Sequence, residues 1–385
     1  MKKHIKLLVV LGIILVGSFS FYLFKGYKKD ALVYENNKIK PSSSGIAMML
    51  ETSAGSGNYE MTTRSEWPTE GYVFNANLSK CENGSELSWD NENKKVLMSG
   101  NKSDKCYVYF DVYVKPQVLL ADYVKSLYVS NNGENGIYHH DASLTNGAGD
   151  NSYRYAGASD QVNNYVCFGS TTTPCPTDNL YRIIGVFGDK VKLIKSTSVG
   201  NKAWDSNSSN TWSTSSLNTY LNNDFLNVFD ETIKGKIDTT TWKVGGNTYS
   251  KIRDVVPSVA YQNEIVSPVT TNTTDNATDY SAKVGLMYAS DYGFAAAKSA
   301  WTSTLYNYDG EAVKSANWMY LGSYEWTISR IADGSAGAFR VDNDGSVLSS
   351  HVGNNAYAVR PVFYLTSSVN YASGSGSATD PIVVN

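Results

Sequence analysis

The sequence predicts an α+β protein with a transmembrane helix, then a small all-β domain, then a larger mixed α/β domain. Three observations predict this order. An uncharged, mostly apolar run covers residues 7–24, which is the pattern of a membrane span. Short strand patterns bounded by turn residues fill 46–114. Strand patterns mixed with helical ones follow from about residue 179, within a domain predicted over 131–385, so the chain can bury more than one core.

Residues 1–24 predict a cytoplasmic start and a signal anchor. The basic stretch Met1–Lys6 precedes the apolar run, which would form a helix of about 27 Å, close to the ~30 Å of a hydrocarbon core. A cleaved signal peptide is the alternative. The run is longer than an h-region of roughly 7–15 residues, and no small-x-small cleavage site precedes Lys25. We therefore expect a single-pass membrane protein, although the sequence leaves cleavage of the anchor open.

Four cysteines indicate the compartment of the chain. The number of cysteines is even, and they form no CxxC or Cys/His zinc pattern; they are Cys81, Cys106, Cys167 and Cys175. Three connectivities are possible, and the simplest pairs Cys81 with Cys106 and Cys167 with Cys175. Because disulfides form in oxidising compartments, we expect the bulk of the chain to be extracellular.

Charge and composition narrow the possible partners. The net charge is −3 and only 18% of residues are charged, whereas 28 tyrosines and 31 glycines are present. The surface is therefore polar without being strongly charged. Nucleic acid is excluded as a partner, because binding it requires a basic stripe that this sequence lacks.

The predicted elements before the large domain are short. Residues 25–45 are polar and turn-rich, as expected of a tether. In the domain 46–114, strands are predicted at 71–74, 95–98 and 107–113. Such a small unit would be marginally stable without the Cys81–Cys106 bridge. Apolar spacing within 115–130 then predicts one short amphipathic helix as a linker.

The large domain is predicted over 131–385, with its core starting at about residue 179. Strands at 181–187 and 190–194 flank Gly188-Asp189, the pattern of a hairpin. Ser213–Ser216 offers hydroxyl groups for the N-cap of a helix, and apolar residues at helical spacing follow up to Phe229.

The C-terminal stretch predicts the closing sheet of this domain. Phe339 and Val341 alternate with polar residues, and Asn343-Asp344-Gly345 supplies a hairpin turn before Val347. Pro361 can only begin the last apolar strand, because it has no N–H for a central ladder. Trp318 and Trp326 are predicted to belong to the core.

No pattern in the sequence specifies a catalytic set. Nucleophile-elbow, zinc-protease, phosphate-loop and dinucleotide motifs are absent. The adjacent pair His139-His140 is interpreted as part of a polar loop, since neighbouring side chains point in different directions. His351 is interpreted as packing, and Asp342–Asp344 as a turn, not a calcium loop. We therefore predict no catalytic residue, no metal site and no cofactor.

One set of motifs resembles a known family. The sequence resembles the W-S-x-S-x-L…L-N…F signature of an uncharacterised extracellular domain family at Trp212-Ser213, Ser216-Leu217, Leu221-Asn222 and Phe225. That family recurs in surface proteins of Gram-positive-type bacteria. The later segments that fit it are Trp326–Ser329, Val359–Val362 and Gly376–Val384. The resemblance covers residues 179–385, and 81–113 resembles an N-terminal module that often accompanies such domains.

A more distant resemblance concerns the fold. Tyr324–Thr327, an arginine-bearing hairpin and Arg360 are similar to the formylglycine-generating enzyme group, which has a C-type-lectin-like fold. This implies a lectin-like domain whose first hairpin and last strand pair and bring its ends together. The enzymes depend on cysteines late in the domain, and this chain has none after Cys175. Their oxidase chemistry is therefore not carried over.

Two classes of function follow as expectations. The first is a membrane-anchored extracellular binding or adhesion module for a glycan, a cell-wall polymer or a protein. The second is an envelope hydrolase that uses carboxylates such as Glu264, Asp291 and Glu325 in a cleft. A structural role in surface assembly is a third possibility.

The sequence also nominates individual side chains for these roles. Loops between 265 and 320, together with the hairpin at Asn343, are predicted to hold the ligand. The ligand candidates are Tyr306, Tyr308, Tyr320, Asn343 and Asp344, with Tyr306 and Tyr308 expected on the surface. Glu325 is predicted to be buried against an arginine, either Arg340 or Arg360.

Overall fold

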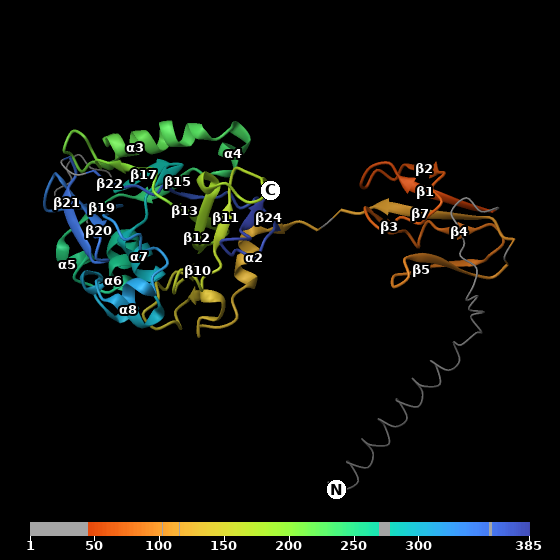
Figure 1. The fold of residues 1–385 in the computed structure, drawn as a ribbon, viewed down its shortest axis with the longest axis horizontal. Coiled ribbons are helices and arrows are strands. Elements are labelled where there is room, and N and C mark those ends of the chain that lie inside the picture. Colours follow the sequence, from red (N-terminus) through yellow and green to blue (C-terminus); the bar gives the residue numbers. More distant parts are fainter. Residues whose placement is uncertain (1–44, 102, 115, 269–277, 354–355) are drawn as a thin grey trace, which may run out of the picture. The chain divides into compact units, whose positions relative to one another are not determined.

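A computed structural model describes residues 45–385 except 102, 115, 269–277 and 354–355 (Figure 1). It is a mixed α+β protein with many strands and few helices, as the sequence predicts. The chain splits into two compact units between Pro116 and Gln117. The predicted membrane helix at 7–24 lies outside the described residues. Within the described part of the chain, no helix is long and apolar enough to span a bilayer.

Unit 1 is built on a five-stranded sheet with the strand order β2-β1-β7-β3, in which β4 also pairs with β7. Its strands are β1 (Ile46–Glu51), β2 (Tyr59–Thr62), β3 (Tyr72–Phe74), β4 (Lys80–Cys81) and β7 (Cys106–Val112). β5 (Glu86–Asp90) and β6 (Lys95–Ser99) form a separate hairpin. The central pair β1 and β7 is parallel.

Strand periodicity explains the core of unit 1. Alternate side chains of a strand point to opposite faces, and the buried residues Met48, Val108 and Phe110 lie at alternate positions on β1 and β7. Trp67 packs on Phe110 with ring centroids 5.8 Å apart. The predicted Cys81–Cys106 disulfide is present and ties β4 to β7.

Unit 2 contains a ten-stranded sheet with the order β18-β23-β13-β12-β11-β25-β24-β8, to which β10 adds through β12 and β9 through β10. Its strands are β8 (Val118–Leu119), β9 (Ile137–His140), β10 (Ser152–Tyr155), β11 (Tyr165–Cys167), β12 (Leu180–Phe187), β13 (Lys190–Lys195), β18 (Val284–Gly285), β23 (Val362–Tyr364), β24 (Asn370–Ser373) and β25 (Ile382–Val384). The second predicted disulfide, Cys167–Cys175, is also present.

A six-stranded sheet carries the predicted closing hairpin. Its strands are β14 (Asn201–Lys202), β22 (Tyr357–Ala358), β19 (Glu325–Ile331), β20 (Gly337–Val341) and β21 (Val347–His351), with β16 (Gly246–Asn247) added to β19. β15 (Thr240–Lys243) and β17 (Asp279–Ala282) form a two-stranded ribbon.

The helices that the structure describes in unit 2 are short. They are α2 (Leu120–Ser126), α3 (Ser216–Tyr220), α4 (Glu231–Lys236), α5 (Tyr249–Ile252), α6 (Pro257–Tyr261), α7 (Ala289–Ala295) and α8 (Glu311–Ser315). Wider turns extend α3 through Leu221–Phe225 and α6 through Gln262–Val266. Single tighter turns are η1 (Glu134–Gly136), η2 (Thr177–Asn179), η3 (Trp212–Thr214), η5 (Leu226–Val228), η7 (Lys298–Thr302) and η8 (Leu305–Asn307).

Turn and cap residues explain where the predicted hairpins turn and where the predicted helix begins. Gly188 and Gly345 adopt φ values of +65° and +96° in their hairpin turns, a region that favours glycine. The predicted helix begins at Ser216, where the Ser215 hydroxyl accepts a hydrogen bond from the Asn218 N–H. Trp318 and Trp326 are buried, as expected. The predicted linker helix is α2, and three of its side chains are buried within unit 2.

One local prediction is wrong. His139 and His140 lie in strand β9, which pairs with β10, and not in a polar loop. His140 is fully buried against Phe294 and Trp301. Pairing with β10 decides the conformation here, because the stretch itself lacks the apolar alternation that marks a strand.

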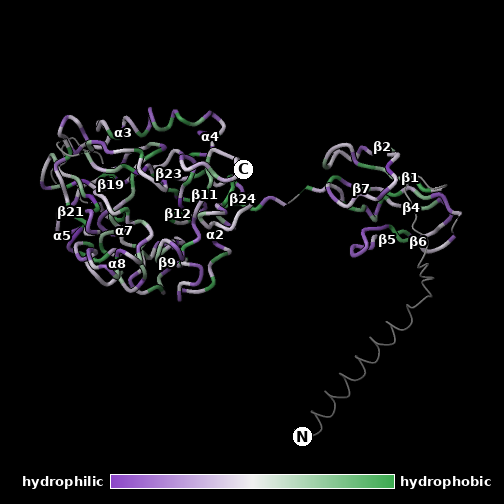
Figure 2. The backbone as a smooth tube through the Cα atoms, in the orientation of Figure 1, coloured by the Kyte–Doolittle hydropathy of each residue, from purple (hydrophilic) through white to green (hydrophobic). Residues whose placement is uncertain are grey.

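The first and last strands of unit 2 share one sheet. β8 pairs with β24, and β25 lies between β24 and β11. The apolar strand that follows Pro361, β23, pairs with β13 of the hairpin as predicted. The C-terminal strand β25 reaches the β12–β13 hairpin only through β11. Hydrophobic segments gather in the sheets of this unit (Figure 2). α3 and α4 run along one side, and α5, α6 and α8 gather at another (Figure 1).

Candidate functional site

The structure brings four of the five predicted ligand residues to the surroundings of the β20–β21 hairpin. Asn343 and Asp344 are exposed in its turn, and the Tyr320 hydroxyl donates a 2.5 Å hydrogen bond to the Asn343 carbonyl oxygen. Tyr306 lies in η8, which packs beside β21. Glycine is required at 345, because an added Cβ would come within 2.8 Å of the Tyr308 carbonyl oxygen. The turn of the β20–β21 hairpin therefore lies close to the backbone at Tyr308.

The prediction that Tyr308 lies on the surface is wrong. Its side chain is fully buried, and its hydroxyl donates to the carbonyl oxygens of Gly293 and Ala300 at 3.0 and 3.2 Å. Burial raises the pKa of this tyrosine. In the turn that contains both tyrosines, Tyr306 faces solvent and Tyr308 faces the core. Both tyrosines lie in the same tyrosine-rich segment, so the sequence did not indicate which of them is buried.

A tyrosine–arginine stack, consisting of Tyr249, Arg253 and Tyr306, forms the most distinctive feature of this surface. The guanidinium carbon of Arg253 lies 4.9 Å from the Tyr249 ring centroid and 4.5 Å from that of Tyr306. The tyrosines are 42% and 46% exposed. A cation over an aromatic face is attracted by the ring quadrupole, so the three side chains hold one another in place.

Main-chain and hydroxyl contacts fix the stack to the scaffold. The Tyr306 N–H donates a 2.8 Å hydrogen bond to the Arg253 carbonyl oxygen. The Tyr249 hydroxyl is hydrogen-bonded to the Ser349 hydroxyl on β21. Arg253 also contacts Asp254, with its Nε 2.9 Å from Oδ1. Tyr249 and Arg253 were missed from the sequence, although their spacing of four places them on one helical face.

A second aromatic–arginine group lies on the other face of the hairpin. The guanidinium carbon of Arg340 is 5.2 Å from the Tyr324 ring centroid and 5.3 Å from that of Tyr357. These two rings stack with centroids 5.1 Å apart. Arg340 pairs with Asp342, Nη2 to Oδ2 at 3.0 Å, so it is not a partner of Glu325. Strand alternation separates Arg340 from that carboxylate.

Glu325 is instead paired with Arg360 in the interior. Nε and Nη2 of Arg360 donate to the two carboxylate oxygens at 2.7 and 2.8 Å. The side chains are only 1% and 3% exposed. Arg360 Nη2 also donates to the Met319 carbonyl oxygen at 2.6 Å. Burial raises the pKa of Glu325, and the facing guanidinium opposes that rise.

The other two carboxylates considered for hydrolysis, Glu264 and Asp291, meet at the start of α7. Glu264 accepts hydrogen bonds from the N–H groups of Ala289 and Ser290 at 3.0 and 2.9 Å, and from the Ser329 hydroxyl. Asp291 accepts from the Tyr288 N–H at 3.0 Å and from Lys192 Nζ at 2.5 Å. Both carboxylates are 3% exposed. Their oxygens are thus satisfied inside the protein.

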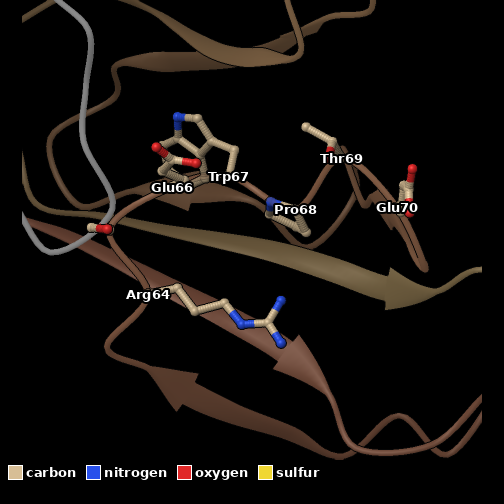
Figure 3. A pocket seen from close by; sticks show the side chains of 7 residues that line it. Arg64, Glu66, Trp67, Pro68, Thr69 and Glu70 are labelled. Atoms are coloured by element: carbon tan, nitrogen blue, oxygen red, sulfur yellow. The ribbon is translucent and has the colours of Figure 1, made fainter.

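A shallow hollow of about 480 Å³ lies in unit 1. Figure 3 shows that its lining comes from one continuous stretch, residues 64–70, with Arg64 set apart from the side chains of Glu66, Trp67 and Glu70. Trp67 is 9% exposed, so most of its ring belongs to the core. The hollow is the concave side of a single loop and gathers no residue from another element.

Comparison with known protein families finds one match, which covers part of the chain. A domain of unknown function (DUF6273) covers residues 188–367. That range contains the tyrosine–arginine stack, the β20–β21 hairpin and the buried carboxylates, and it leaves out unit 1. No match was found among curated proteins or among solved structures.

Proposed function

We propose that this chain is a membrane-anchored extracellular binding module, in which unit 2 acts as a C-type-lectin-like domain that holds a glycan or cell-wall polymer. The exposed tyrosine–arginine stack carries this proposal. The apolar run at 7–24 and the two disulfides support an anchored, exported chain.

The chemistry of the stack suits a sugar polymer. Tyrosine offers a flat apolar face and a hydroxyl group, so it can cover the face of a ring and bond to it at the edge. Arg253 adds a planar set of donors. Because the arginine already rests on both rings, little conformational freedom is left to lose when a ligand binds. The amide and carboxylate of Asn343 and Asp344 extend the polar surface around the hairpin.

The same geometry gives less support to the envelope hydrolase. Hydrolysis by two carboxylates requires that both face a cleft that admits the glycosidic bond. Glu264 and Asp291 accept hydrogen bonds from the backbone of α7, and Glu325 is closed in by Arg360. The binding module therefore remains the better-supported proposal.

The test is a binding screen of the full-length chain in mild detergent against glycans and cell-wall fragments, with product analysis in parallel. We expect saturable binding without turnover. The double change Tyr249→Ala and Tyr306→Ala should weaken binding at least about tenfold, as expected when a central aromatic contact is lost. Turnover of a bound glycan would instead favour the hydrolase.

The matched control is Tyr113→Ala in unit 1, where the tyrosine is 52% exposed. It should leave affinity unchanged. Full affinity in the double variant, or loss of binding on deletion of residues 46–114 alone, would place the site elsewhere. Binding to a protein and to no glycan would retain the module but replace the ligand class.

A further inference from the structure

A lysine and an aspartate lie in direct contact in the core of unit 2. Lys192 comes from strand β13 and Asp291 from helix α7, 99 residues later. The Lys192 Nζ is 2.5 Å from the Asp291 Oδ2, and the two side chains are 1% and 3% exposed. Water has almost no access to either group.

Aromatic rings surround the lysine head group. Its Nζ lies 4.8 Å from the Tyr288 ring centroid, 5.4 Å from Tyr364, 5.5 Å from Phe187 and 5.8 Å from Trp242. Such walls stabilise a cation to some extent but cannot replace its hydration. A buried ion pair recovers its desolvation cost only if the geometry satisfies both partners.

Two further charged groups act on the same carboxylate. Arg154 Nη1 lies 3.7 Å from Asp291 Oδ1 and is itself held by Asp150 at 2.6 Å. Glu264 bonds to the N–H of Ser290, next to Asp291, and its charge acts on both Asp291 and Lys192. The set thus comprises an amine, a carboxyl group, a guanidinium and a second carboxyl group, all enclosed.

We propose that Lys192 and Asp291 condense spontaneously to form an intramolecular isopeptide bond between Nζ and Cγ. The unprotonated amine attacks Cγ of the protonated carboxyl group, the C–N bond forms, and a C–O bond breaks. One carboxyl oxygen leaves as water with one proton from the amine and one from the carboxyl group. No oxidant, cofactor or other reactant is consumed.

Each neighbour has a role in this step. Arg154 faces Oδ1 and stabilises the negative charge that develops on that oxygen in the tetrahedral intermediate. Glu264 accepts hydrogen bonds from the N–H groups of Ala289 and Ser290, so it fixes the start of α7 and positions Asp291 against the amine. The proton of the amine passes to the Asp291 oxygen that the amine already contacts and leaves with it as water. The aromatic walls exclude bulk water, which favours an amide over its hydrolysis products.

The electrostatics of the site support the nucleophilic form of the lysine. Burial lowers the pKa of the Lys192 ammonium, against the opposing effect of Asp291. Burial also raises the pKa of Glu264, against its hydrogen bonds from Ser290 and Ser329. The shift of Lys192 favours the neutral amine, and a desolvated lysine is the nucleophilic one.

A neighbouring pair on the same strand provides an internal comparison. Lys190 contacts Asp238 at 2.7 Å, but these side chains are 38% and 19% exposed. Water reaches both groups there, so neither is desolvated, and no closed apolar site protects an amide from hydrolysis. We therefore expect this pair to remain an ion pair.

Peptide mapping of the folded full-length chain tests the bond directly. After reduction and trypsin digestion, residues 191–195 should appear joined to residues 284–298, lighter by one water than the two peptides together. Trypsin should not cleave after Lys192, because an acylated lysine is no longer a substrate. Residues 190 and 238 should be found in separate peptides. This inference stands independently of the proposed ligand.

Variants separate the participants. Lys192→Met should abolish the linked species. Glu264→Gln should slow its appearance after refolding by at least about tenfold, because a misplaced carboxyl group is attacked more slowly. Unchanged formation in Glu264→Gln would overturn the role of Glu264. If the wild-type chain is folded by circular dichroism and yields only separate peptides, the isopeptide bond itself is overturned, whatever the variants do.

Discussion

The buried Glu325–Arg360 pair yields the sharpest prediction on stability. Changing Glu325 to Gln preserves the size of the side chain but leaves Arg360 charged, 3% exposed and without a carboxylate. Removing one partner of such a pair typically costs about 3–5 kcal/mol, because the remaining charge is uncompensated. At roughly 2–4 °C per kcal/mol for a unit of this size, the melting temperature should fall by about 10 °C.

The assay is urea and thermal unfolding followed by tryptophan fluorescence, which reports mainly on unit 2. The matched control is Asp279→Asn, which breaks the Lys243–Asp279 contact of 2.8 Å with side chains 34% and 47% exposed. That exposed pair should contribute at most about 1 kcal/mol. The two variants lose the same formal charge, so their difference isolates the effect of burial.

A compensating change refines the result. Replacing Glu325 with Leu and Arg360 with Met in the same chain should recover most of the lost stability, since apolar substitutes of similar size avoid desolvation altogether. If Glu325→Gln unfolds at the same urea concentration as the wild type, the ion pair does not contribute as its geometry indicates, and the reasoning from burial is refuted.

Three further predictions concern other parts of the structure. Although burial alone would raise it, Arg154 and hydrogen bonds from Ser152 hold the pKa of Asp150 below its ordinary 3.8. Its contribution is thus present above that pH and lost as the pH falls further, so Asp150→Asn should flatten the acid limb of stability measured by urea midpoints. Reducing Cys81–Cys106, which closes a loop of 25 residues, should destabilise unit 1 by about 3.5 kcal/mol, seen as faster proteolysis of that unit. Among the described residues, neither Nη of Arg330 has a hydrogen-bond partner although the side chain is 1% exposed. Arg330→Met should therefore raise the free energy of unfolding by about 1–4 kcal/mol, measured by urea unfolding; a lower free energy would show that the charge is compensated.

Local chemistry accounts for what could be predicted of the fold. The hairpins at Gly188 and Gly345 follow from turn residues that tolerate positive φ. The helix at Ser216 follows from its cap. Sequential pairing of four cysteines gave both disulfides. In each case the deciding interaction lies within a short stretch of chain.

The features that could not be predicted from the sequence depend on contacts between residues far apart in the chain. The burial of His140 depends on β10 and on rings more than a hundred residues away. Tyr306 and Tyr308 differ only in which one faces the core, and composition contains no such information. The tyrosine–arginine stack joins α5 to η8 across some fifty residues, so its members could be nominated separately but not assembled.

Two buried cation–carboxylate pairs of unit 2, Lys192–Asp291 and Arg360–Glu325, are expected to differ in their chemistry. A guanidinium stays protonated and is delocalised over three nitrogens, so Arg360 has no free lone pair and its contact with Glu325 remains ionic. Burial lowers the pKa of Lys192, and its amine is held against the carboxyl group of Asp291. Condensation would convert two costly buried charges into one neutral amide. A chain that contains only 18% charged residues would thereby lose one buried ion pair from its core and gain a covalent tie between β13 and α7. Glu325 and Arg360 can offer only an ionic contact between their strands.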